Sequence, residues 1–212
     1  MRGNFERCLA ETLKHEGGWA DHPDDPGGAT MRGVTIGTYA QFKGRKVTKA
    51  ELRAIPEADL RVIYRRNYWD KLRCDDLPEG LDLVAFDAAV NSGPARGARW
   101  LQQAIGAADD GKVGPNTLAA ARRAYAPAAV MRAIAIRRGF LKSLKKWPTF
   151  GRGWTDRLDA IEAAALAMAE VQPPRPDVDP AEAMPEAGSQ PGLIAAVVTI
   201  IAALAAYLGW GK

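Results

Sequence analysis

The sequence has few of the residues that metal sites and disulfide frameworks require. Its 212 residues include two cysteines and two histidines. Cys8 and Cys74 are too few for a disulfide framework, so we expect two free thiols. His15 and His22 are poorly accompanied by the cysteines or carboxylates that would complete a metal site. The sequence therefore predicts no metal site, and nothing in it indicates a cofactor.

A large excess of charge of one sign and an N-terminal signal are also missing. The formal net charge is +4 at pH 7, which favours an anionic polymer such as a peptidoglycan strand with its peptide carboxylates. The same charge would suit nucleic acid, but no cluster of arginines and aromatics forms a readout motif, so we expect no nucleic-acid partner. Residues 1–4 lead directly into charged, amphipathic sequence, so no N-terminal signal peptide is predicted.

One carboxylate lies at the end of a predicted helix. Apolar residues recur at helical spacing from Phe5 to Leu13 behind Asn4, an N-cap residue, which predicts a helix over residues 5–15. Glu16 continues this apolar stripe, and two glycines then let the chain leave the helix. Partial burial and the negative end of the helix dipole both disfavour the ionised carboxylate. Such a group suits a general acid that protonates a glycosidic oxygen near neutral pH.

A polar, glycine-rich segment follows this carboxylate. Asp25 lies nine positions after Glu16 in a stretch rich in Asp, Pro and Gly, which must be a loop. Thr30 and Thr35 follow in a short run that suits a hairpin. A hydrolase that uses water as its nucleophile needs a second polar group across the sugar, and an Asp or Thr side chain can orient that water. Turn formation alone would also explain the Asp-Pro-Gly-Gly sequence.

Six motifs occur in order along the chain. They are Glu-Gly-Gly at 16–18, Asp-Pro-Gly-Gly-Ala-Thr at 25–30, Gly-Val-Thr at 33–35, Phe-Asp-Ala-Ala-Val-Asn-Ser-Gly at 86–93, Ala-Arg-Trp-Leu-Gln-Gln-Ala-Ile-Gly at 98–106 and Asp-Gly-Lys-Val-Gly-Pro-Asn-Thr at 110–117. Together they resemble glycoside hydrolase family 108, the lysozyme-like muramidases found among phage endolysins and secretion-linked bacterial lysozymes. The last motif is similar to the second half of that family, often called a peptidoglycan-binding domain.

The resemblance implies a specific reaction. Glu16 would be the essential acid, and the bond cut would be the β-1,4 bond between N-acetylmuramic acid and N-acetylglucosamine. The chain is also similar to phage-type lysozymes, in which a Glu, an Asp and a Thr at similar spacing form the active site. We therefore interpret Asp25 and Thr30 as further catalytic residues, although Thr30 comes one residue earlier than in that pattern. Which of Asp25, Thr30 or Thr35 assists Glu16 stays open.

Four residues are candidates for substrate binding. Trp19 and Tyr68 offer flat faces with polar edges for sugar stacking, whereas most other aromatics of the chain should lie in the core. Thr35 is explained equally well by a strand. Asn91 ends a predicted helix, where it either faces a cleft or caps the next helix.

Two further polar features have structural explanations. Asp87 lies among apolar residues of a predicted helix, where an ion pair with an arginine is more common than a catalytic role. The motif at 110–117 has the pattern of a turn that leads into a helix with proline at its first position. The resemblance adds a cell-wall contact as an alternative for this motif.

The predicted fold class is mainly α, with a small β or loop excursion and a C-terminal transmembrane helix; the resemblance makes the helical domain lysozyme-like. Thr48 and Glu51 form a capping box, and a final amphipathic helix is predicted over residues 154–171. The expected domain division is listed by range: a lysozyme-like catalytic half over 1–93, a helical peptidoglycan-binding-like half over 94–171 packed on it, a proline-rich linker over 172–191 and a transmembrane helix over 192–210.

The last of these segments is uncharged and rich in Ala, Ile, Leu and Val. As a helix, residues 192–210 would span roughly 28 Å at 1.5 Å per residue, close to the thickness of a bilayer. The alternatives are a helix that docks on the globular domain or pairs with another copy. The sequence thus predicts a lipid bilayer as partner, with the catalytic domain acting on the cell wall from the periplasmic side. A holin or a secretion-type pore is a further partner considered for export.

Two hypotheses of function follow from the sequence. The first is a membrane-tethered peptidoglycan hydrolase that acts on glycan strands as a muramidase. The alternative is a non-catalytic, membrane-anchored module that binds the cell wall.

Overall fold

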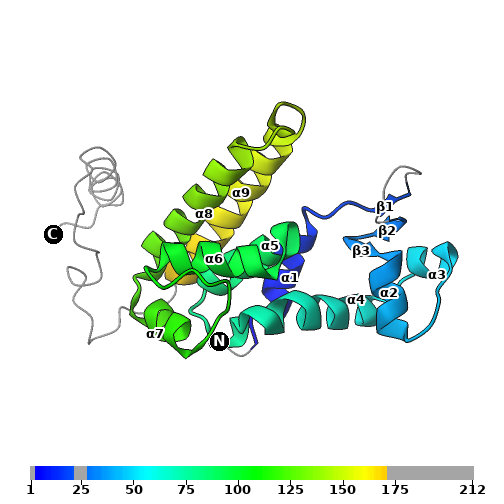
Figure 1. The fold of residues 1–212 in the computed structure, drawn as a ribbon, viewed down its shortest axis with the longest axis horizontal. Coiled ribbons are helices and arrows are strands. Elements are labelled where there is room, and N and C mark those ends of the chain that lie inside the picture. Colours follow the sequence, from blue (N-terminus) through cyan, green and yellow to red (C-terminus); the bar gives the residue numbers. More distant parts are fainter. Residues whose placement is uncertain (1–2, 22–27, 171–212) are drawn as a thin grey trace.

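The computed structural model describes residues 3–21 and 28–170, and these residues form a mainly helical molecule with one small sheet (Figure 1). The α-helices are α1 (Phe5–Leu13), α2 (Ile36–Lys43), α3 (Lys49–Arg53), α4 (Glu57–Tyr64), α5 (Leu81–Ser92), α6 (Pro94–Ala104), α7 (Pro115–Arg123), α8 (Ala126–Lys142) and α9 (Trp147–Glu170). The strands are β1 (Trp19–Ala20), β2 (Thr30–Met31) and β3 (Val34–Thr35). A π-helical turn (Arg65–Trp69) and two 3-10 turns (Asp70–Leu72 and Cys74–Asp76) lie between α4 and α5. The prediction of a mainly helical fold is confirmed.

Helix α1 ends at Leu13, slightly earlier than the predicted end at residue 15. The chain then turns, and the Glu16 N–H donates to the Leu13 carbonyl at 3.3 Å. Asn4 occupies the N-cap position, but its side chain does not cap the helix. Its amide instead donates to Asp82 at 2.8 Å, which ties the start of α1 to the start of α5.

The three strands form an antiparallel sheet in the order β1-β2-β3. Met31 pairs with Val34, so β2 and β3 are joined by the two-residue turn of Arg32 and Gly33. Both turn residues have positive φ, +47° and +75°, as the type I′ turns of tight hairpins require. The predicted hairpin between Thr30 and Thr35 is therefore confirmed.

Helix α5 is the centre of the core. Every residue from 81 to 89 is buried, and α1, α6, α8 and α9 pack around the helix. Gly97 lets the backbone of α6 approach α5 closely, because a Cβ there would lie 2.8 Å from the Ala89 nitrogen. One cluster of buried hydrophobic residues extends from Phe5 to Met168, so both predicted halves contribute to the same core. Cys8 and Cys74 are buried in this cluster as free thiols, as predicted.

The helix starts show which sequence signals were sufficient. The capping box of Thr48 and Glu51 is present at the start of α3. Helix α9, in contrast, begins at Trp147 and not at the predicted Trp154. Pro148 lies in the first turn of α9, where a missing N–H costs no intrahelical hydrogen bond. The helix therefore starts seven residues earlier than predicted, with this proline inside it.

The predicted transmembrane helix requires a correction. Residues 192–210 and the linker at 172–191 lie outside the described residues. Over residues 3–21 and 28–170, the structure has no helix that combines the length and the apolar character needed to cross a bilayer. Helix α9 has 24 residues, but charged side chains interrupt it from Arg152 to Glu162. The transmembrane part of the predicted fold class and the predicted membrane-anchored localisation are therefore not supported by the part of the chain that the structure describes.

Candidate active site

Glu16 lies where α1 gives way to the sheet, and its side chain is 17% exposed. Its Oε1 accepts a hydrogen bond of 2.8 Å from Arg157 Nη1, which comes from α9. Its Oε2 has no hydrogen-bond partner among residues 3–21 and 28–170. One carboxylate oxygen is thus fixed by a cation, and the other is available to a ligand.

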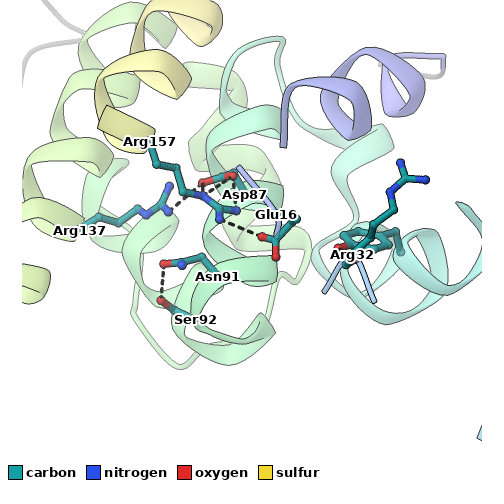
Figure 2. A network of polar contacts seen from close by, with 8 residues as sticks. Glu16, Arg32, Asp87, Asn91, Ser92, Arg137 and Arg157 are labelled. Carbon is teal, nitrogen blue, oxygen red and sulfur yellow. Dashed lines mark hydrogen bonds and ion pairs between the residues drawn. The ribbon is translucent and has the colours of Figure 1, made fainter. Parts of the chain in front are cut away.

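Arg157 connects Glu16 to a buried carboxylate on α5 (Figure 2). Its Nη2 donates to Asp87 Oδ1 at 2.8 Å, and its Nε lies 3.1 Å from the same oxygen. Arg137 of α8 donates to Asp87 Oδ2 at 2.8 Å from the other side. The ion pair predicted for Asp87 is therefore confirmed, and it involves two arginines. Four helices or helix ends that are distant in the chain meet in this network.

The charges of this network explain how a fully buried carboxylate stays ionised. Burial alone would raise the pKa of Asp87, but the guanidinium groups of Arg137 and Arg157 outweigh it and lower that pKa. Burial likewise opposes the charge on Arg157, yet the carboxylates of Asp87 and Glu16 raise its pKa. The sequence argument for Glu16 considered only burial and the helix dipole. That argument lacked the arginine.

The turn of the hairpin lies against Glu16. A Cβ on Gly33 would be 3.0 Å from Glu16 Oε2 and would collide with the hydroxyl of Tyr64. The Tyr64 hydroxyl donates to the Arg32 carbonyl at 2.8 Å and so holds the turn in place. Glycine at position 33 therefore serves both the positive φ of the turn and the approach of the turn to the carboxylate.

Tyr68 lies on the same side of the site. Its ring is 5.5 Å from that of Tyr64, measured between centroids. Burial raises the pKa of Tyr68, and the charge of Glu16 raises it further, which places the phenol within electrostatic reach of the carboxylate. Tyr68 is half-buried, so part of its ring remains open to a ligand.

The other predicted site residues lie in different surroundings. Trp19 is in β1, paired with Met31, and the Arg53 guanidinium covers its ring at 5.1 Å. Thr30 is half-buried in β2, where its hydroxyl lies 3.4 Å from the Gly28 carbonyl. Asp25 lies outside the described residues.

The sequence left two alternatives each for Thr35 and Asn91, and the structure places both side chains. The Thr35 hydroxyl accepts from the Thr38 N–H at 3.1 Å and caps α2, so it already has a structural role. Asn91 is exposed, one turn after Asp87 on α5, and accepts from Ser92 at 3.1 Å. Neither Asn91 nor Ser92 caps α6 with its side chain. Figure 2 shows Asn91 beside the charged network.

The loop at 110–117 forms a second polar network, centred on the buried amide of Gln102. The Gln102 amide nitrogen donates to Asp110, to the Lys112 carbonyl and to Thr117, at 2.8 to 3.1 Å. Its oxygen accepts from the Gly111 N–H at 2.9 Å. The polar groups of this motif thus satisfy one another, which favours the structural explanation for it. Among the described residues, no three His, Cys, Asp or Glu side chains gather into a group that could hold a metal ion.

The sequence analysis missed both arginines of the Glu16 network. A signal for them exists: Arg137 lies at helical spacing between Ile134 and Leu141, and Arg157 precedes Ile161 by four residues. A charged residue on an otherwise apolar stripe is buried with its helix face and needs a partner. The sequence could indicate such a pair, but not which carboxylates complete it.

The chain is similar to known proteins in sequence and in fold. The sequence profile described as Glycosyl hydrolase 108 matches residues 9–93, and the one described as Predicted Peptidoglycan domain matches residues 96–159. The structure of Brucella abortus SagA is similar to this chain, with 42% sequence identity and a TM-score of 0.71. The match covers 80% of this chain and 97% of that one. No curated protein matches.

Proposed function

The chain belongs to glycosyl hydrolase family 108, and from this premise we propose that it is a muramidase that cleaves the β-1,4 bond between N-acetylmuramic acid and N-acetylglucosamine. Family membership makes it a glycoside hydrolase with a lysozyme-like fold, and peptidoglycan is its substrate. The proposal adds the bond that is cut and the residues that cut it. We keep the division into a catalytic half at 1–93 and a wall-binding half at 94–171 as part of the proposal.

The observation that carries the proposal is the unequal environment of the two Glu16 oxygens. A protonated carboxyl group has one carbonyl oxygen and one hydroxyl. Oε1, held by Arg157, is suited to be the carbonyl oxygen that accepts a hydrogen bond. Oε2, beside the hairpin turn, then carries the proton and donates it to the glycosidic oxygen. Arg157 keeps its contacts with Asp87 throughout, so the acid is oriented without being surrounded by donors.

The second step needs a water molecule on the opposite face of the sugar. We assign the positioning of this water to Asp25 or Thr30, because a carboxylate can accept the proton of the water and a hydroxyl can orient it. Thr35 is the weaker candidate, since its hydroxyl caps α2. For substrate contacts we propose Tyr68, which adjoins Glu16, together with Trp19 and Asn91.

The test is a Glu16→Gln variant of the full chain with purified sacculi as substrate. We expect the wild type to release products with muramic acid at the reducing end, identified by mass spectrometry. Glu16→Gln should lower this rate by at least about 100-fold, since it removes the proton donor but keeps the shape of the side chain. Glu11→Gln is the matched control, because Glu11 lies on α1 and pairs with Lys14 at the surface.

The outcomes separate the hypotheses. Unchanged hydrolysis by Glu16→Gln refutes the role of Glu16. Sacculus binding by the wild type without release of reducing ends would return the non-catalytic module as the better explanation. Products that end in N-acetylglucosamine would refute the assigned bond.

A further inference from the structure

The joined ends of α8 and α9 carry a cluster of aromatic side chains, Trp147, Phe150 and Trp154, called here the aromatic tip. Phe150 is 49% exposed, and its ring stacks on Trp154 at 5.8 Å with an interplanar angle of 29°. The ring centroids of Trp147 and Trp154 lie 6.1 Å apart. Gly151 makes room for the Trp147 indole, since a Cβ there would lie 2.8 Å from that ring. The rings therefore form one continuous apolar surface.

This surface continues the helix face that reaches Glu16. The aromatic tip and Arg157 lie at successive spacings of three, four and three residues, which places them on one side of α9. Ten residues of helix extend about 15 Å, so the row runs from the partner of Glu16 to the end of the helix. Figure 1 shows the ends of α8 and α9 projecting beyond α5 and α6. Along this face Trp147 and Trp154 are partly buried against the core, and Phe150 is exposed to solvent.

Positive charge surrounds the aromatic tip. Lys142, Lys145, Lys146 and Arg152 are all exposed, and residues 142–155 contain no Asp or Glu. None of these four cations forms an ion pair with a residue that the structure describes. Surface cations elsewhere, such as Arg45 and Arg61, do pair with glutamates. This end of the molecule thus offers unneutralised positive charge beside flat rings.

We propose that the aromatic tip and its four cations bind the peptidoglycan strand beyond the bond that is cut. This inference rests on the proposed function and adds a binding site remote from the reacting atoms. The flat rings would stack on the apolar faces of successive sugars. The ammonium and guanidinium groups would pair with the carboxylates of the stem peptides. The common face with Arg157 favours a glycan over a lipid surface, because a strand on the tip is aligned with Glu16.

The test measures binding separately from catalysis. Full chains that carry Glu16→Gln are sedimented with purified sacculi, and the dissociation constant is measured with and without a second substitution. Phe150→Ala and Lys145→Glu should each weaken binding roughly three- to tenfold. Tyr125→Ala and Arg123→Glu are matched controls, since Tyr125 is 56% exposed on another part of the surface and Arg123 ends α7. The controls should bind as the parent does.

A second measurement uses chains in which Glu16 is intact. Phe150→Ala should raise KM for sacculi and leave kcat within about twofold, because it removes a contact shared by ground state and transition state. An active Glu16→Gln chain would refute the catalytic role of Glu16 but leave the binding comparison valid. Unchanged sacculus binding by both tip variants overturns the inference. The same is true if Phe150→Ala weakens only the binding to phosphatidylethanolamine and phosphatidylglycerol vesicles.

Discussion

Helix α5 buries two carboxylates in opposite ways, Asp82 in its first turn and Asp87 near its middle. Asp82 and Asp87 lie on the same helix, and both are 0% exposed. Asp87 faces the guanidinium groups of Arg137 and Arg157. Asp82 accepts from neutral donors, the amide of Asn4 at 2.8 Å and the Leu83 N–H at 2.7 Å, and no guanidinium group pairs with it among the described residues.

The difference shows which partners keep a buried carboxylate charged. Burial raises the pKa of Asp82 to about 6, and its hydrogen bonds offset only part of that effect. At Asp87 the two guanidinium groups outweigh burial, and the pKa is lowered. The helix therefore carries a strongly held charge at Asp87, which supports Glu16 through Arg157, and a weakly held one at Asp82. A substitution at or beside one of these carboxylates leaves the other as a reference.

The largest effect on stability is expected at Asp87. Asp87→Asn removes the counter-charge of two buried arginines, and we expect it to lower the free energy of unfolding by about 3–5 kcal/mol. Urea denaturation at pH 7 measures this loss. Hydrolysis of sacculi should also fall, because Arg157 loses the partner that orients it toward Glu16. A loss of stability below about 1 kcal/mol would contradict the importance of the network.

A second substitution tests the cause of that loss. Arg137→Met removes one of the two cations and fills its space with an apolar chain of similar length. In the Asp87→Asn background it should recover part of the stability, since an unpaired buried charge costs more than an absent one. If the loss in free energy of unfolding of the double variant equals the sum of the losses of the single variants, charge balance is not the reason for the loss.

The surroundings of Glu16 and Asp87 also show how far the sequence predicts the structure. The apolar stripes, the hairpin and the position of Glu16 after α1 follow from local spacing, because neighbours in the chain set them. The network does not, because Arg157 is 141 residues from Glu16 and 70 from Asp87. Tertiary packing selects such partners, and one sequence without structure does not contain the distances. The start of α9 was missed for a related reason, since Pro148 is compatible with a first turn.

The contribution of Asp82 to the free energy of unfolding should depend on pH. The folded state holds the Asp82 proton up to a pKa of about 6, whereas the ordinary value is 3.8. The folded state therefore binds more protons between these values, and the contribution of Asp82 to stability falls as pH rises from 4 to 6. A difference of about two pKa units corresponds to about 3 kcal/mol.

The Asp82→Asn variant isolates this contribution. Relative to the wild type, the variant should gain about 3 kcal/mol in free energy of unfolding between pH 4 and pH 7. Asp87→Asn should show the opposite sign, because a lowered pKa contributes stability above the ordinary value that is lost in acid. If the free energy of unfolding relative to the wild type changes with pH in the same direction for both variants, the contrast between Asp82 and Asp87 is refuted.

The smallest expected effect comes from the neutral partner of Asp82. Asn4 does not cap α1, so Asn4→Ala removes its hydrogen bond to Asp82 without removing a cap. The amide lowers the pKa of Asp82, and its loss should raise that pKa further and cost about 1 kcal/mol at pH 7. At pH 4 the cost should be smaller, because Asp82 is protonated in the folded state and the bond no longer involves a charge. In the Asp82→Asn background, the Asn4→Ala cost should not change with pH. A cost that is equal at both pH values in the wild-type background would show that Asn4 acts through packing and not through the charge of Asp82.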